Sequence, residues 1–123
     1  MLAVLLLLPA PSALAAGRLH VVVRGQDHRP RVGRQWHYLV RVTNAATGKP
    51  VACRIHLQFL LGAVPVGEVG VHVVESGFWQ ETFGKDGNPP FPPAARGQHL
   101  VLEATVTAKG YARAKAGWAI TVR

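Results

Sequence analysis

Apolar and polar residues alternate along most of the chain, a pattern typical of β-strands with one buried face. The longest alternating segment runs over residues 51–61, where Arg54, His56 and Gln58 separate the apolar positions. Similar alternation covers residues 19–24, 36–42, 100–107 and 111–123, and shorter β-rich segments cover 64–66, 69–74 and 78–83. The pattern predicts about seven strands and contains no convincing helix.

Turn-forming residues separate the predicted strands. Residues 26–33 and 43–50 are rich in residues that favour turns, and Gly67 and Gly70 predict bulges or bends in a β-rich stretch. Residues 84–93 contain four prolines and suit no regular strand, so we expect them to cross between sheets. Two packed antiparallel sheets bury these apolar faces most simply, so the predicted fold class is all-β, an antiparallel β-sandwich.

The interior of this sandwich is predicted from the phase of each strand. Cys53 is in phase with Val51 and Ile55, so we expect a buried and unreactive thiol. Trp36 and Trp118 fall in the apolar phase and are expected in the core. Cys53 is the one cysteine of the chain, so no intramolecular disulfide can form and the fold relies on its hydrophobic core.

The amino-terminal segment predicts export. An apolar run over residues 1–8 is followed by Pro9, Pro11 and the small-x-small motif of Ala13 and Ala15. The run is shorter than the roughly 20 apolar residues that cross a bilayer as a helix, and it is typical of a secretory signal peptide. We therefore predict a signal peptide over residues 1–15, with cleavage near Ala15. The expected mature domain is 16–123, secreted or at the cell surface and without a transmembrane segment.

Charge is distributed unevenly in the predicted mature chain. The formal net charge is +8, and residues 18–54 hold eight Lys and Arg against one acidic residue. Basic patches attract polyanions, so Arg29, Arg31 and Arg34 are candidate ligand-binding residues. The expected partner is an anionic cell-envelope polymer or another surface protein. Export argues against nucleic acid. Alternatively, the arginines reflect composition alone.

Aromatic residues near the Pro-rich segment offer a second candidate. Trp79 lies with Phe78 and Phe83 close to the loop that contains Phe91. If Trp79 is exposed, its ring predicts a platform that stacks on a sugar or a peptide. In the alternative interpretation, these aromatic side chains close one end of the sandwich.

Catalytic and metal-binding motifs are poorly represented. Ser76 is the single serine of the predicted mature chain, and it lacks the Gly-x-Ser-x-Gly elbow. We therefore predict no catalytic residues, no enzyme activity and no cofactor. His20, His37 and His56 occupy the outward phase of three successive strands and would converge if those strands shared a sheet. Neighbouring arginines would repel a cation, so we assign no metal ligand.

Two segments carry a resemblance to a known family. Pro30 to Gly33, followed by a strand and by the sequence Thr-Gly-Lys-Pro-Val at 47–51, resembles the opening of bacterial immunoglobulin-like (Ig-like) domains. Residues 97–106 are similar to their penultimate strand, and the resemblance extends over 18–123. It implies an Ig-like β-sandwich with a structural, adhesive or binding role and with no catalytic residues to transfer.

The expected function is therefore that of an exported, non-catalytic Ig-like domain with a structural, adhesive or binding role at the bacterial cell surface. One alternative is a carbohydrate- or polyanion-binding module that uses the basic stretch or Trp79. A further alternative is an extracytoplasmic metal-binding sandwich that uses the histidines.

Overall fold

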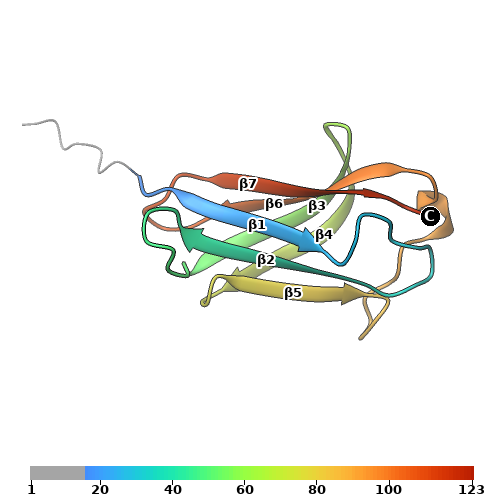
Figure 1. The fold of residues 1–123 in the computed structure, drawn as a ribbon, viewed down its shortest axis with the longest axis horizontal. Coiled ribbons are helices and arrows are strands. Elements are labelled where there is room, and N and C mark those ends of the chain that lie inside the picture. The colour runs from blue at the N-terminus through green and yellow to red at the C-terminus, as the bar shows by residue number, and fades with distance from the viewer. Residues whose placement is uncertain (1–15) are drawn as a thin grey trace, which may run out of the picture.

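The computed structural model describes residues 16–123, and the predicted signal peptide, 1–15, lies outside the described residues. This part of the chain forms seven strands and one short 3₁₀ helix (Figure 1). In chain order these are β1 (Leu19–Gly25), β2 (Trp36–Asn44), β3 (Cys53–Leu61), β4 (Val64–Val74), β5 (Phe78–Phe83), the helix η1 (Pro93–Ala95), β6 (His99–Thr107) and β7 (Ala114–Thr121).

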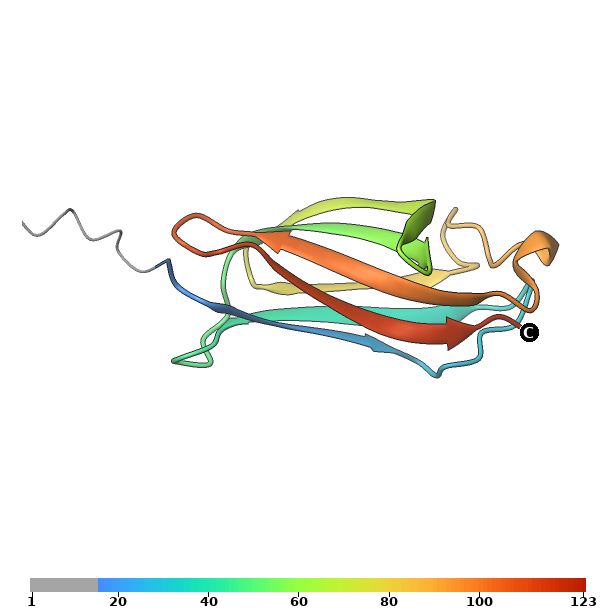
Figure 2. The same ribbon diagram turned by 90° about the horizontal axis from the view of Figure 1, so that it is seen from above.

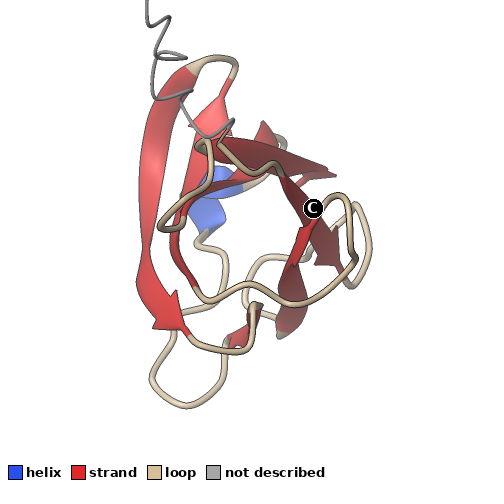
Figure 3. Ribbon diagram, turned by 90° about the vertical axis from the view of Figure 1, so that its left-hand side faces the viewer, coloured by secondary structure: helices blue, strands red, loops and turns tan. Residues whose placement is uncertain are grey.

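The strands form two antiparallel sheets, in the orders β1-β2-β5 and β4-β3-β6-β7. The sheets stack face to face (Figure 2), and an end-on view shows the strands arranged around the interior (Figure 3). The predicted all-β sandwich is therefore confirmed. The Pro-rich segment crosses from β5 in one sheet to β6 in the other, as expected. The alternation pattern did not reveal η1, because a single 3₁₀ turn leaves no periodic signal.

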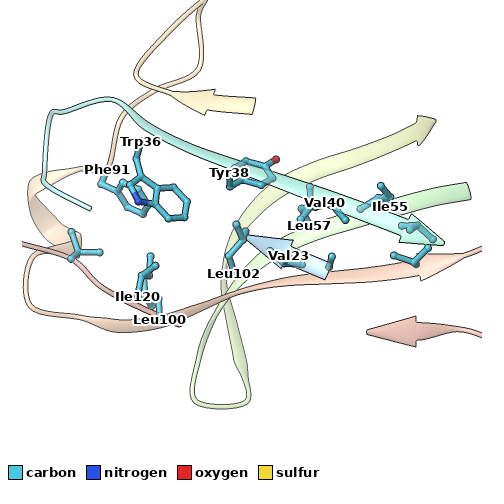
Figure 4. Close-up of a cluster of buried hydrophobic side chains, with 14 of the residues drawn as sticks. Val23, Trp36, Tyr38, Val40, Ile55, Leu57, Phe91, Leu100, Leu102 and Ile120 are labelled. Carbon is cyan, nitrogen blue, oxygen red and sulfur yellow. The ribbon is translucent and has the colours of Figure 1, made fainter. Parts of the chain in front are cut away.

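The core lies between the sheets, where the alternation of each strand directs its apolar side chains (Figure 4). Trp36, Tyr38 and Val40 of β2 are almost fully buried, and Cys53 is buried as predicted. Desolvation raises the pKa of the Cys53 thiol, which keeps it in the unreactive protonated form. Trp118 differs from its prediction because β7 is an edge strand, so its indole is half-buried rather than part of the core.

Two bulges interrupt β4, next to the glycines that predicted them. The register with β3 shifts twice, leaving Val69 and Val66 as the extra residues. Gly70 then pairs with Leu57 and Gly67 with Phe59. Because paired residues of an antiparallel sheet project to the same face, both glycines take inward positions. At these two positions β4 therefore sends no side chain into the sandwich, although Val69 between them packs against the core.

The two lateral sides of the sandwich, where the edge strands of one sheet meet those of the other, differ in how closely they pack. On one side β1 packs along β7, whereas on the other side β4 and β5 approach each other at few points. None of the helices within residues 16–123 is long and apolar enough to cross a membrane.

Candidate ligand-binding sites

A cavity of about 440 Å³ opens between β4, β5 and the Pro-rich crossover. This volume lies in the range of small-molecule sites. Three of its lining residues, Phe59, Phe83 and Phe91, are aromatic, and their ring centroids are 5.5–5.8 Å apart. Gly67 and the prolines at 89, 90 and 92 form further parts of the lining. The cavity exists because a glycine replaces a side chain on β4 and because the prolines prevent the crossover from pairing as a strand.

Glu81 brings a carboxylate to this cavity. In the β2–β5 register Trp79, Glu81 and Phe83 lie opposite Val40, Tyr38 and Trp36, so they share the inward face of β5. Glu81 is half-buried and lines the cavity. The alternation of residues 79, 81 and 83 already placed Glu81 on this inward face. A carboxylate between two aromatic residues is expected there only if another group donates a hydrogen bond to it.

Tyr38 supplies that group. Its hydroxyl oxygen lies 2.9 Å from Glu81 Oε1 and 3.0 Å from Trp79 Nε1. An indole N–H is a donor only, so the Tyr38 oxygen accepts from Trp79 and its own proton is donated to Glu81. Burial strongly raises the pKa of Tyr38, so the hydroxyl retains this proton. The direction of the hydrogen-bond chain therefore holds Glu81 Oε1 as an acceptor.

Trp79 is not positioned as a surface platform. It lies in β5, as the β-rich segment 78–83 predicted, but it is half-buried and stacks on His72 of β4 with ring centroids 3.6 Å apart. One face of the indole is thus unavailable to a sugar. The imidazole bridges the two strand edges, yet its buried Nε2 has no hydrogen-bond partner within residues 16–123.

The three candidate arginines, Arg29, Arg31 and Arg34, are exposed on the loop between β1 and β2. The backbone joins this loop to the end of the chain, because Val32 N donates to the carbonyl of Arg123 at 2.8 Å. Gly97 N similarly donates to the carbonyl of Val122 at 2.8 Å, which places the segment after η1 beside them (Figure 1).

Two more arginines thereby join the predicted three. We call the exposed side chains Arg29, Arg31, Arg34, Arg96 and Arg123 the basic end. No ion pair within residues 16–123 involves any of them. Sequence reasoning missed Arg96 and Arg123, because they are distant along the chain and only the fold brings their segments to this loop.

The condition under which the three histidines would converge is not met, because their strands do not share a sheet. His20 and His37 lie in the β1-β2-β5 sheet, whereas His56 lies on β3 in the other sheet, so their outward phases face opposite sides of the sandwich. His37 Nδ1 instead lies 3.0 Å from the Thr82 hydroxyl, and His56 Nε2 lies 2.7 Å from Glu68 Oε1. Within residues 16–123, no three His, Cys, Asp or Glu side chains are grouped to hold a metal ion.

No protein-family model matches the sequence, and no curated protein matches it significantly. Several solved structures resemble the fold, among them a reductase and a CARDB domain. A superoxide reductase (neelaredoxin) from Ignicoccus hospitalis matches with a TM-score of 0.60 and 16% identity, over 85% of this chain and 82% of that chain. The CARDB domain of a Pyrococcus furiosus protein, solved in complex with di-metal ions, matches with a TM-score of 0.54 and 16% identity, over 89% and 90% of the two chains. At these identities the likeness shows the fold alone, which is an Ig-like antiparallel β-sandwich.

Proposed function

We propose that this chain is an exported, non-catalytic Ig-like domain that binds an anionic polymer of the cell envelope through its basic end. The observation that supports the proposal is that five exposed arginines from three segments lie at one end of the sandwich and form no ion pair with any residue of 16–123. Export itself rests on the amino-terminal sequence pattern.

The chemistry of the basic end suits a polymer with repeated anionic groups. A guanidinium group binds phosphate, carboxylate or sulfate with paired hydrogen bonds and stays charged at every physiological pH. One exposed charge contributes little, because water and salt screen it over about 8 Å. A polymer chain engages several arginines together, so the individual contributions accumulate.

The loop that carries the three candidate arginines is held in place by local contacts. Asp27 Oδ1 accepts hydrogen bonds from Arg29 N at 2.8 Å and from Trp36 Nε1 at 3.1 Å. Arg123 N donates to the Pro30 carbonyl at 2.8 Å, and Pro30 is buried. Less backbone entropy is then lost when the arginines bind.

Elution from a dextran sulfate column with a salt gradient tests the proposal. The variant R29E/R31E/R34E removes part of the basic end. The control variant R18E/R54E/R113E changes three exposed arginines at the opposite end, where the backbone of Gly17 bonds to Gly110 and Ala112. Both variants have the same net charge, so they separate a local site from overall basicity.

We expect the wild type and the control variant to elute at similar salt concentrations, and the basic-end variant to elute much earlier. Equal losses in the two variants would show that total charge alone drives retention. Absence of retention of the wild type at low salt would contradict the proposal outright.

A further inference from the structure

The charge of the cavity is opposite to that of the chain. The charged residues that line it are Glu68 and Glu81, and no Lys, Arg or His is among its lining residues. The whole chain has 14 Lys and Arg against 6 Asp and Glu. We propose that this cavity, which adjoins the basic end through the hydrogen bond from Gly33 N to the Phe91 carbonyl, binds a small organic cation, an ammonium group carried on an apolar body.

The aromatic lining suits both parts of such a ligand. Phe59, Phe83 and Phe91 offer apolar surface to the body of the ligand, and their π-systems attract a cation held within about 6 Å of a ring. Phe91 is buried by the packing of the crossover, and Phe83 is held on β5 beside Glu81. An ammonium group between these rings and Glu81 would meet favourable charge on both sides.

Glu81 provides the fixed negative charge. Its Oε1 is oriented by the Tyr38 hydroxyl, and this hydrogen bond leaves Oε2 for a ligand. Because Tyr38 is in turn held by Trp79, the carboxylate does not need to reorganise when a cation enters. Its partial burial also reduces the screening that weakens exposed ion pairs.

The other charged groups nearby are already engaged or face water. Glu68 is exposed at the rim and contacts His56 at 2.7 Å, so Glu81 is the carboxylate that we assign to the ligand. Lys85, Asp86 and His37 line an adjoining polar hollow, which Glu81 also borders. Arg96 follows a lining residue but its side chain is exposed, so salt screens it from the cavity.

Three probes with one apolar body and different charges test the assignment. They are 4-phenylbutylammonium, 4-phenylbutan-1-ol and 4-phenylbutyrate, each titrated into the purified protein and followed by calorimetry and by amide NMR shifts. We expect the ammonium to bind about tenfold more tightly than the alcohol, with shifts at Phe59, Gly67 and Phe83. We expect the carboxylate to bind most weakly.

Two variants locate the charge and the cavity. Glu81→Gln keeps an acceptor for Tyr38 and should abolish the preference for the ammonium over the alcohol. Its matched control is Glu103→Gln, because Glu103 lies on the other sheet, 3.9 Å from Lys115, and is not among the cavity residues. Gly67→Leu fills the cavity and should weaken all three probes. A Cβ at Gly67 would lie 3.5 Å from Phe59, an ordinary contact distance.

Several results would overturn the proposal. Binding of the carboxylate at least as tight as that of the ammonium would show that the surrounding arginines determine the ligand. An unchanged ammonium preference in Glu81→Gln would remove Glu81 from the site. Wild-type affinity in Gly67→Leu, or no shift of any probe at millimolar concentration, would show that the cavity is not a binding site.

Discussion

The two lateral sides of the sandwich differ in what a glycine does at each. On the β1–β7 side, Gly25 lets two indoles approach the backbone, and a Cβ there would collide with the rings of Trp36 and Trp118. On the β4–β5 side, Gly67 faces ordinary contact space above Phe59. One glycine therefore allows tight packing that closes the sandwich, and the other leaves a cavity. The same residue type has opposite consequences because two indoles occupy the space of a Cβ at Gly25, whereas the Phe59 ring stays at contact distance from a Cβ at Gly67.

The largest expected effect is that of Gly25→Ala. The new methyl group overlaps two large aromatic rings, so we expect a loss of about 2–4 kcal/mol in the free energy of unfolding. Gly67→Ala is the matched control and should change stability by less than about 1 kcal/mol. Urea unfolding of both variants measures the difference. Equal losses would contradict the contrast between the two sides.

The next largest effect is expected for Tyr38→Phe. Removing the hydroxyl leaves the Trp79 N–H and Glu81 Oε1 without their shared partner, which costs about 1–3 kcal/mol when such groups are buried. Glu81→Gln retains an acceptor and should cost less. The two variants are compared by urea unfolding at neutral pH. A larger loss of unfolding free energy in Glu81→Gln than in Tyr38→Phe would show that the Tyr38 hydroxyl does not hold Trp79 and Glu81 of β5 in place.

Stability should also fall at alkaline pH. Burial raises the pKa of Tyr38, the larger shift, and also that of Cys53. A raised folded-state pKa means that the unfolded chain releases the proton first. Each contribution is therefore complete below the unfolded value, about 10 for Tyr and about 8.5 for Cys, and is lost as the pH rises above it. Tyr38→Phe should flatten the decline above about pH 10. An unchanged slope in this variant would assign the decline to other groups.

The smallest effect is expected at His72, and it has the opposite sign. His72→Phe keeps an aromatic ring against Trp79 but removes the buried Nε2 that lacks a partner. We expect a gain of up to about 1 kcal/mol, seen as a higher Tm. His99→Phe is the control, because His99 is exposed and bonded to the Thr121 hydroxyl, so its replacement should bring no gain. A loss of stability in His72→Phe would show that the imidazole makes a stabilising polar interaction between β4 and β5.

The alternation of apolar residues predicted the strands and, apart from Trp118, the inward faces named in advance, and the glycines predicted the bulges near Gly67 and Gly70, because all of these are local properties of the chain. Sheet membership was not predictable in this way. The histidine hypothesis required β3 to share a sheet with β1 and β2, whereas β3 starts the second sheet. Pairing between distant strands is decided by the packing of the whole core, which no local pattern records.

The candidate sites divide along the same line. Arg29, Arg31 and Arg34 are close in sequence, so their shared position was visible as a charge pattern. Arg96, Arg123 and Phe59 come from separate segments that the fold brings to these sites, whereas Phe83 and the loop with Phe91 were already neighbours in the sequence. Trp79 was identified by residue type, but its burial against His72 depends on the position of β4 relative to β5, and these two strands belong to different sheets.

The most direct test of the proposed function is the binding of three proteins to isolated envelope of the source cell at one low ionic strength. These are the wild type, R29E/R31E/R34E and the control R18E/R54E/R113E. We predict that the wild type and the control sediment with the envelope and that the basic-end variant stays in solution. Equal sedimentation of the two charge-matched variants, or none by the wild type, would contradict the proposed function.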